Sequence, residues 1–327
     1  MKSSTLVFAA LACAAVLPAG TATAADAAKT YPDRPIRMIV PNAPGSSVDT
    51  LSRIAGSKLS EVLGEQIVID NRAGAAGVIG MEIAKAASPD GYTIIAATTA
   101  ATTIARLLQK KPTFDPLKDY DFIAQFAETP NVLVVNPSLP VKSVKELIDY
   151  CKGKQGRVNM ASAGAGSQSH LSGVYFLQAA KFESLHVPYK GGGPSVASVI
   201  AGESQWTLTP APAVMSQVNS GRLRAIGHSL PKRSALLPNI PAIAETIPGF
   251  DYSGWQGFMM PKGTPKAISG KLRAAVAKMA ELPDFRKAMA VQATEIVVRG
   301  PEEFRKVVEE SMVKNAQVVK AVGLTAN

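Results

Sequence analysis

The sequence predicts an α/β protein that folds as two lobes with a ligand cleft between them. Short apolar runs of strand length alternate with stretches of helical periodicity from residue 36 onward. This alternation favours parallel sheets that bind ligands at the carboxyl ends of their strands. Long extended runs at 121–137 and 251–260 interrupt it, and two such runs can cross between lobes as a hinge. We expect the first lobe at 25–125 and 250–327, and the second at 126–249.

The first lobe is expected to begin with a buried strand at 36–40, because this run is apolar, β-branched and stopped by Pro41. A helix is expected at 48–63, where apolar residues recur at helical spacing and Ser46 or Ser47 can cap the first turn. A strand at 66–70 and a helix at 77–87 repeat this unit. A strand at 92–97 and a helix from about 101 to 109 complete the series.

The second lobe is expected to repeat the alternation. Ser143 and Glu146 form a capping box that opens a helix to about residue 152. Strands are then expected at 158–161, 184–189, 204–209 and 223–228, and helices at 170–180, 195–201 and 212–219. After the second crossing, helices at 265–281, 284–290 and 301–322 end the chain.

The turns between strand and helix are the candidate binding site. The loops before the helices at 48–63 and 77–87 hold small residues and free backbone N–H groups, and the dipole at a helix N-terminus favours an anion. The run from Ala163 to Ser167 is their counterpart in the second lobe, where glycines let backbone approach a ligand closely. Two such loops side by side would suit a carboxylate.

Several motifs in the same order extend this reading. They are Y-P-D-R-P-I-R-M-I-V-P-N-A-P-G-S-S-V-D at 31–49, I-D-N-R-A-G-A-A-G at 69–77, S-P-D-G-Y-T at 88–93 and A-S-A-G-A-G-S-Q-S-H-L at 161–171. With these runs the chain resembles, over essentially its whole mature length, the periplasmic solute-binding proteins of tripartite tricarboxylate transporters, the Bug or TctC family. The resemblance implies the type II, Venus-flytrap fold of a two-lobe periplasmic binding protein.

The resemblance also implies a function and partners. Such a protein captures a small organic carboxylate, which can be a di- or tricarboxylate, an amino acid or an aromatic acid, and delivers it to the membrane subunits of a tripartite tricarboxylate transporter. No cofactor or metal is expected, and a monomer is expected. Two alternatives stay open at this point: a protein that presents its ligand to a two-component sensor kinase, and an α/β hydrolase.

In the family, one ligand carboxylate is gripped by the two first-lobe loops, largely through backbone amides and ordered water. Carried over by position, those amides belong to Ala43, Gly45, Ser46 and Ser47, and to Gly74, Ala75, Ala76 and Gly77. Asp49 matches the acid of the family pattern P-G-G-x-x-D. On its own, however, Asp49 is also an acid in a first helical turn, where the dipole favours it. The chain departs from many relatives at Asn42, where they have an aromatic, and at Ser46, where they have a second glycine.

Further candidates come from the residues themselves. Thr98 and Thr99 end the third strand and can either reach the cleft or cap the next helix. Ala163, Gly164 and Ser167 form the second-lobe loop, and His170, Lys190 and Thr209 could line that side of the cleft. His170 can equally be a satisfied surface histidine. Trp206 and Trp255 could stack on a ligand, but aromatic residues at strand positions more often fill a core.

The N-terminus predicts export. Lys2 precedes an apolar stretch and the small-residue run 19–25, so we expect a signal peptide at 1–24 and a periplasmic mature protein. Without it the net charge falls from +10 to +9, since the segment holds one lysine and no acid. The cations are dispersed and no nucleic-acid motif occurs, which favours small anions over nucleic acid as partners. Cys151 alone remains, so no internal disulfide is expected.

The motifs of common enzymes do not occur. Gly74-x-x-Gly77-x-x-Gly80 is not the dinucleotide pattern, and the chain contains no Walker A motif, no G-x-S-x-G elbow and no H-E-x-x-H. Ser167 and His170 are three residues apart, but the sequence marks no third partner for them. We therefore expect a binding protein rather than an enzyme.

Overall fold

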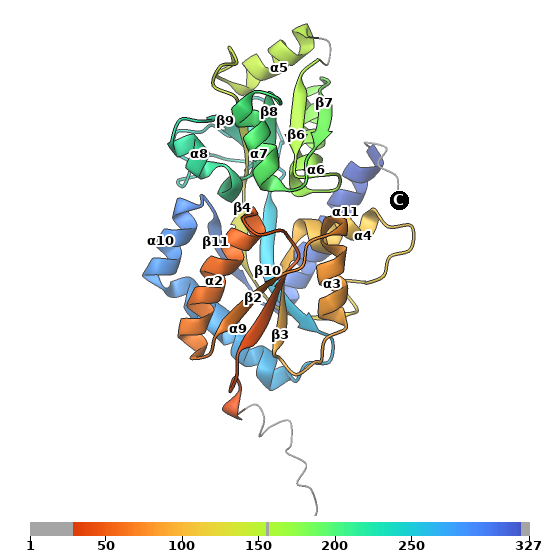
Figure 1. Ribbon diagram of the computed structural model, residues 1–327, viewed down its shortest axis with the longest axis vertical. Helices are drawn as coiled ribbons and strands as arrows, with labels where there is room; N and C mark the ends of the chain where they lie inside the picture. The colour runs from red at the N-terminus through yellow and green to blue at the C-terminus, as the bar shows by residue number, and fades with distance from the viewer. Residues whose placement is uncertain (1–28, 155–156, 322–327) are drawn as a thin grey trace, which may run out of the picture.

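The computed structural model describes residues 29–154 and 157–321. It contains two mixed β-sheets, each in its own lobe, and the lobes follow one another along the long axis of the molecule (Figure 1). The first sheet has the strand order β11-β4-β10-β3-β1-β2 and the second has the order β7-β6-β8-β5-β9. The first comprises β1 (Ile36–Val40), β2 (Ile67–Asn71), β3 (Thr93–Thr98), β4 (Tyr120–Thr129), β10 (Gly254–Pro261) and β11 (Glu295–Arg299). The second comprises β5 (Asn131–Val135), β6 (Asn159–Ser162), β7 (Leu185–Pro188), β8 (Trp206–Pro210) and β9 (Arg224–His228).

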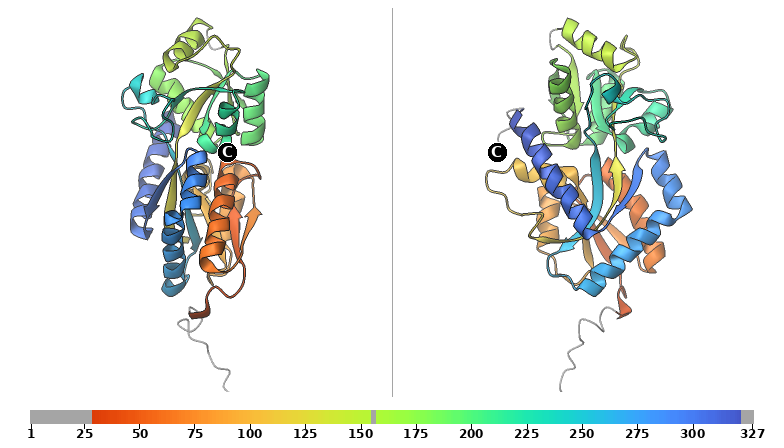
Figure 2. Two further views of the ribbon diagram at one scale, coloured as in Figure 1. Left: turned by 90° about the vertical axis from the view of Figure 1, so that its left-hand side faces the viewer. Right: turned by 180° about the vertical axis from the view of Figure 1, so that it is seen from behind.

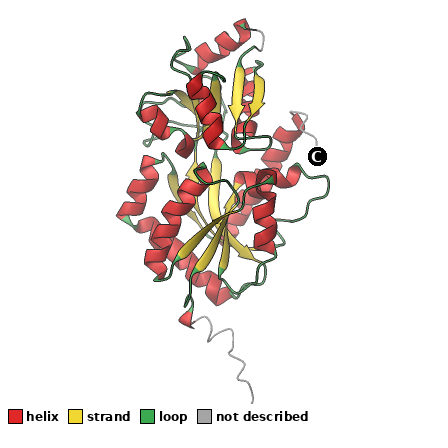
Figure 3. Cartoon of the chain, in the orientation of Figure 1, coloured by secondary structure: helices red, strands yellow, loops and turns green. Residues whose placement is uncertain are grey.

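Helices cover both faces of the first sheet (Figure 3). α2 (Ser47–Leu63), α9 (Lys266–Glu281) and α10 (Pro283–Val291) share one apolar cluster with the strands, built on residues such as Leu59, Leu272 and Phe285. α3 (Val78–Lys85) and α11 (Pro301–Ala321) share the cluster on the other face, which includes Met81 and Phe304. β1 pairs in parallel with β2 and β3, so the loops that follow these strands emerge at one edge of the sheet.

The second sheet is covered in the same way. α5 (Val144–Gly153) and α6 (Gln168–Ala180) pack on one face with Trp206, while α7 (Gly192–Ala201) and α8 (Met215–Asn219) flank the other. The end of α11 also reaches this lobe, since Val318 and Val319 join the cluster of Trp206. The last helix thus begins against the first sheet and ends against the second (Figure 2).

Two strands carry the chain between the lobes. β4 runs antiparallel to β10 in the first sheet, and Pro130 separates it from β5 of the second. Proline has no N–H to donate to a ladder, which makes it a natural break between two sheets. The return runs through Phe250 and Tyr252, which pack in the second-lobe core, into β10. We propose the lobe boundaries at these two points, a few residues beyond those expected from sequence.

The expected elements are present, with three differences. β11 was missed, although it pairs with β4 at the sheet edge. The helix expected at 101–109 is a π-helical turn, η2 (Thr99–Ile104), followed by the single turn α4 (Ala105–Leu107). The helix expected at 212–219 is divided into η3 (Ala211–Ala213) and α8, because Val214 leaves the helical region with φ −126°. Two short 3-10 turns, η1 (Ala75–Gly77) and η4 (Ile243–Glu245), complete the described elements.

The expected signal peptide lies outside the described residues. Within the described part of the chain no helix combines the length and the apolar character needed to cross a membrane. Cys151 is fully buried on α5, and burial raises the pKa of its thiol to about 12, so it is an inert part of the second-lobe core.

Candidate functional site: an anion cleft between the lobes

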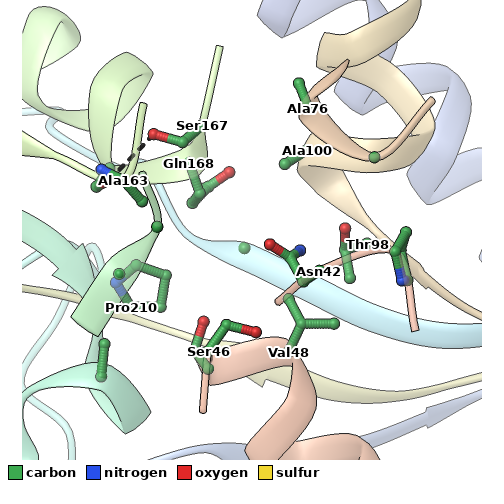
Figure 4. Close-up of a pocket in the computed structure, with 18 of the residues that line it drawn as sticks. Asn42, Ser46, Val48, Ala76, Thr98, Ala100, Ala163, Ser167, Gln168 and Pro210 are labelled. Atoms are coloured by element: carbon green, nitrogen blue, oxygen red, sulfur yellow. Dashed lines mark hydrogen bonds between the residues drawn. The ribbon is translucent and has the colours of Figure 1, made fainter. Parts of the chain in front are cut away.

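A cavity of about 430 Å³ lies between the two lobes, with walls from both lobes and from the crossing strand β10 (Figure 4). Its first-lobe wall includes Asn42 and Ser46, and its second-lobe wall includes Ala163 and Gln168. A volume of this size is within the range of small-molecule sites.

The first loop of the cavity is held from behind by Asp49. Ser46 caps α2 by accepting a hydrogen bond from the Asp49 N–H at 3.2 Å. The Asp49 carboxylate in turn accepts hydrogen bonds from the Gly45 N–H at 2.8 Å, from Asn71 Nδ2 at 2.9 Å and from Arg53 Nε at 3.0 Å. Burial would raise the pKa of this carboxyl, but the hydrogen bonds from Arg53, Gly45 and Asn71 hold it below its usual value. Asp49 therefore shapes the loop and does not line the cavity.

The second loop has a strained backbone. Gly74 has φ +130°, Ala75 has φ +46°, Ala76 has φ +57° and Gly77 has φ +104°. Left-handed alanines are unfavourable, and such strain is concentrated at functional sites. At Gly77 a Cβ atom would lie 2.6 Å from the Ala101 Cβ atom, so only glycine fits. The loop thus brings bare backbone to the cavity through Gly74, Ala76 and Gly77, while Ala75 does not line it.

Thr98 combines the two roles that the sequence allowed, whereas Thr99 lines the cavity without capping the helix. Both line the cavity. Thr98 Oγ1 caps the following turn by accepting from the Ala101 N–H at 3.2 Å, and Thr99 Oγ1 accepts from the Trp255 N–H of β10 at 3.0 Å. The two hydroxyls therefore tie the end of β3 to the next helix turn and to the crossing strand.

The second-lobe loop is held by serine and histidine side chains. Ser169 Oγ accepts a hydrogen bond from the Ala163 N–H at 2.9 Å, and Ser162 Oγ accepts one from the Gly164 N–H at 3.2 Å. Ser167 caps α6 by accepting from the His170 N–H at 3.2 Å. No carboxylate takes part in these contacts, in contrast to the first loop.

His170 supports this loop and does not line the cavity. Its Nδ1 atom accepts a hydrogen bond from the Gly166 N–H at 3.1 Å, which fixes Nδ1 as the unprotonated nitrogen. Its ring stacks on that of His186 with 3.9 Å between centroids, and His186 Nε2 lies 2.7 Å from Ser162 Oγ. Burial, with a smaller contribution from His186, lowers the pKa of His170 to about 4. The imidazole is thus neutral and buried, and it is neither a surface residue nor part of the cavity wall.

Helix N-termini converge on the cavity from both lobes. Ser46 and Ser47 begin α2, Ser167 and Gln168 begin α6, and Gly191 and Gly192 begin α7, and all of these residues line the cavity. The turn η1 adds the start of α3. Each N-terminus presents unpaired N–H groups and a partial positive charge.

The charge of the lining side chains also favours an anion. Among the described lining residues Lys190 alone carries an ionisable side chain, and no aspartate or glutamate lines the cavity. Lys190 is exposed and makes no ion pair within the described residues. The cavity is therefore suited to an organic anion.

Comparison with known proteins places this chain in a family. Residues 51–324 match the model of the tripartite tricarboxylate transporter family receptor, TctC. The chain belongs to this family. It is 34% identical to Protein BugT of Bordetella pertussis over 298 residues, which cover 90% of this chain and 91% of BugT.

Solved structures agree with this assignment. The periplasmic binding protein BugD has a TM-score of 0.84 at 29% identity, covering 90% of this chain and 99% of BugD. An R. palustris protein with adipate has a TM-score of 0.86 at 30% identity, covering 90% of this chain and 98% of that one. MatC from Rhodopseudomonas palustris with bound malate has a TM-score of 0.82 at 28% identity, covering 88% of this chain and 100% of MatC. The expected family and the two-lobe periplasmic-binding-protein fold are confirmed, and the chain is a solute-binding protein of the TctC family.

Most of the residues expected at the site of this TctC-family protein do line the cavity. They are Asn42, Ala43, Ser46, Ser47, Gly74, Ala76, Gly77, Thr98, Thr99, Ala163, Gly164, Ser167, Lys190 and Thr209. Four others do not line it: Gly45 and Ala75, which are exposed, and Asp49 and His170, which are buried. The Gly45 N–H donates to Asp49, and the Asp49 and His170 side chains are occupied by the backbone N–H groups that they hold.

Sequence reasoning missed several lining residues, among them Gln168 and Gln256. Gln168 lies between Ser167 and Ser169 in the quoted A-G-A-G-S-Q-S-H motif, so its place at the head of α6 was a signal that could have indicated it. Trp255 was left open and is on the cavity wall, with its Nε1 atom donating to Ser311 Oγ at 2.8 Å. Trp206 is fully buried in the second-lobe core.

Proposed function

We propose that this protein captures a small organic carboxylate in the cleft between its lobes and delivers it to a tripartite tricarboxylate transporter. The observation that carries the proposal is the convergence of the N-termini of α2, α6 and α7 on one cavity, whose described lining residues include Lys190 and no acid. The first-lobe loops supply a carboxylate grip of backbone N–H groups, and the second lobe closes over the ligand.

The relatives support the carboxylate class. Adipate and malate, the ligands of two similar structures, are both dicarboxylates. The family name supports delivery to a tripartite transporter, and the periplasmic relative supports export of this chain to the same compartment, with its signal peptide removed. We also propose that the protein acts as a monomer without nucleic acid and without a cofactor.

Binding without chemistry is favoured by the contacts of Ser167 and His170. A hydrolase would need the imidazole within hydrogen-bond reach of the serine hydroxyl. Here Ser167 Oγ accepts from the backbone N–H of His170, whereas His170 Nδ1 accepts from the Gly166 N–H and the ring stacks on His186. The two side chains therefore act as scaffold for the loop, which supports a binding protein over an enzyme.

The test is a thermal-shift screen of the mature protein against di-, tri-, aromatic and amino-acid carboxylates. A ligand at about one hundred times its dissociation constant should stabilise the protein by about 2.7 kcal/mol. The diamide of each active dicarboxylate, which has no anionic group, is the matched control and should give no shift. Small-angle scattering should show a smaller radius with ligand. If no carboxylate raises the melting temperature, the proposal is wrong.

Delivery is tested separately in cells. A strain that lacks the gene should lose uptake of the labelled ligand identified in the screen, and a plasmid copy should restore it. Normal uptake in the deletion strain would remove the transport role while leaving the binding role intact.

A further inference from the structure

The carboxamide of Gln168 is buried at the cavity without a hydrogen-bond partner. Both its Nε2 donor and its Oε1 acceptor are shielded from solvent, and neither atom has a partner within the described residues. Among the described residues that line the cavity, Gln168 alone has buried side-chain atoms in this condition. A buried donor or acceptor left unpaired is costly, so a glutamine is retained in such a place when something else completes its bonds.

A second glutamine that lines the cavity has a fully engaged donor, in contrast to Gln168. Gln256 of β10 also lines the cavity, but its Nε2 atom donates to Ser52 Oγ at 2.9 Å and to the Val48 carbonyl at 3.4 Å. Gln256 thus joins the crossing strand to α2 and is a structural residue. Gln168 makes no such contact and is free to pair with a ligand.

The position of Gln168 places it at the seam between the lobes. It is the first residue of α6, between Ser167 and Ser169, whose hydroxyls hold the loop. Its carboxamide lies over Gly254 of β10, with Nε2 3.6 Å from the point that a Cβ atom would occupy there. Asn42 and Ser46 of the first lobe lie across the cavity from it (Figure 4). A ligand held by the first-lobe loops therefore meets Gln168 at its other end.

The charges of the cavity limit which chemical group of a ligand can face Gln168. None of the described residues that line the cavity is acidic, and the nearby carboxylate of Asp49 is occupied by Gly45, Asn71 and Arg53. A ligand ammonium group would be buried without a counterion, which is unfavourable. A carboxylate facing Gln168 could accept from Nε2 but would leave Oε1 against a second acceptor. A neutral carboxamide satisfies both atoms, because it has a donor and an acceptor side by side.

We propose that Gln168 selects the ligand, by pairing its carboxamide with a neutral group that both donates and accepts, so that the preferred class is a monocarboxylate bearing a carboxamide at its far end. This inference rests on the proposed function, since it names the ligand class of the same cleft. It separates this chain from a receptor for simple dicarboxylates and from one for zwitterionic amino acids.

The experiment is calorimetric titration of the full mature protein with ligands of equal shape. Succinate, succinamate and 4-oxopentanoate differ only in the far group, which is an anion, a neutral donor and acceptor, or an acceptor alone. The glutarate and adipate series, with their monoamides and methyl ketones, cover longer spans. At the best length the monoamide should bind about tenfold tighter than the ketone, since the ketone can accept from Gln168 Nε2 but leaves Oε1 without a donor.

Variants tie this preference to Gln168. Gln168→Ala should bind the monoamide and the ketone equally. Gln168→Glu should lose the amide preference and gain binding of the ω-amino acid of equal length, 4-aminobutanoate for the succinate series, because an acid then faces the ammonium. Gln178→Ala, at an exposed position on the same helix, is the matched control and should keep the parent preference.

Two outcomes would overturn the inference: equal binding of amide and ketone by the parent protein, or a preference that survives in Gln168→Ala. Either result, obtained while dicarboxylates still bind, would leave the proposed carboxylate function standing. Failure of every carboxylate and every monoamide to bind would instead remove both proposals.

Discussion

The two lobes present similar loops to the cleft but hold them by different chemistry. In the first lobe, the Asp49 carboxylate gathers the Gly45 N–H, Asn71 and the Arg53 guanidinium behind the loop. In the second lobe the same task falls to neutral groups, with Ser169 holding Ala163 and the His170 imidazole holding Gly166. One scaffold is ionic and the other depends on histidines that stay uncharged.

The difference implies different sensitivities. Asp49 has a lowered pKa and stays ionised until the solution is more acidic than the usual range of a carboxyl group. His170 titrates at about pH 4 in the folded protein but at its ordinary value near 6.5 when unfolded. Mild acid is therefore expected to destabilise the second-lobe loop first, while Asp49 remains ionised and still holds the first-lobe loop.

The largest expected effect is loss of the first-lobe grip through Gly77→Ala. A Cβ atom there would lie 2.6 Å from the Ala101 Cβ atom and 3.1 Å from its Cα atom, so the loop must move. Affinity for the ligand should fall by about one hundredfold, as two hydrogen bonds to a charged group are lost. Calorimetry on protein shown to be folded by circular dichroism measures this.

Gly64→Ala is the matched control for that variant. Gly64 ends α2 with φ +78°, and a Cβ atom there meets nothing within 4 Å. This change carries a similar cost of left-handed backbone, about 1 kcal/mol, but should leave affinity unchanged. Folded Gly77→Ala protein that binds like the parent would show that the loop is not the grip.

Asp49→Asn tests the ionic scaffold. The amide keeps the size of the side chain but weakens the bonds from the Gly45 N–H and from Arg53, so the free energy of unfolding should fall by about 2 kcal/mol. Arg53 is half exposed, which limits the Coulomb part of this loss. Asp284→Asn is the control, since this carboxylate is 82% exposed and 3.6 Å from Lys58. Urea unfolding should show almost no change for the control, and equal losses in the two variants would contradict the scaffold role of Asp49.

The neutral scaffold predicts the pH dependence of stability. Between pH 6.5 and about 4, the unfolded chain binds a proton at His170 that the folded chain does not, so the free energy of unfolding falls as the pH falls through this window. The contribution of Asp49, whose folded pKa is also depressed, is fully present there and is lost only at lower pH. His170→Asn retains an acceptor for the Gly166 N–H and removes the titration. Its urea midpoint should therefore change less over this window, and an unchanged slope would show that His170 is not the group responsible.

The placement of the loops could be predicted from sequence because strand length, stop residues and capping serines are local signals. The orientation of side chains within a loop could not. Asp49 and His170 both follow a capping serine by three residues, at positions where a polar side chain can face either the cleft or the loop. The orientation of these side chains depends on the backbone of the folded loop, which includes the positive φ angles of Ala75 and Ala76 and the hydrogen bond from the Gly45 N–H.

Long-range pairing explains what else was missed. β11 is a five-residue run between two helices, and it becomes a strand by pairing with β4, more than 160 residues earlier in the chain. Gln168 was missed because its carboxamide lies against Gly254 of the crossing strand and faces the cavity between the lobes, and both features exist only in the folded protein. A helix-start residue has no such partner in its local sequence.

The smallest expected effect separates capping from ligand binding in the second lobe. Ser167 and Ser143 are both N-cap serines of helices in this lobe, and each accepts the N–H three residues on at 3.2 Å. Alanine at either position should lower the free energy of unfolding by about 1 kcal/mol through loss of the cap. Only Ser167 lines the cavity, so Ser167→Ala alone should also weaken ligand binding, by about fivefold if one hydrogen bond to the ligand is lost. Paired urea and calorimetric titrations measure both quantities, and equal affinities in the two variants would confine Ser167 to the cap and leave closure to Gln168 and the α7 N-terminus.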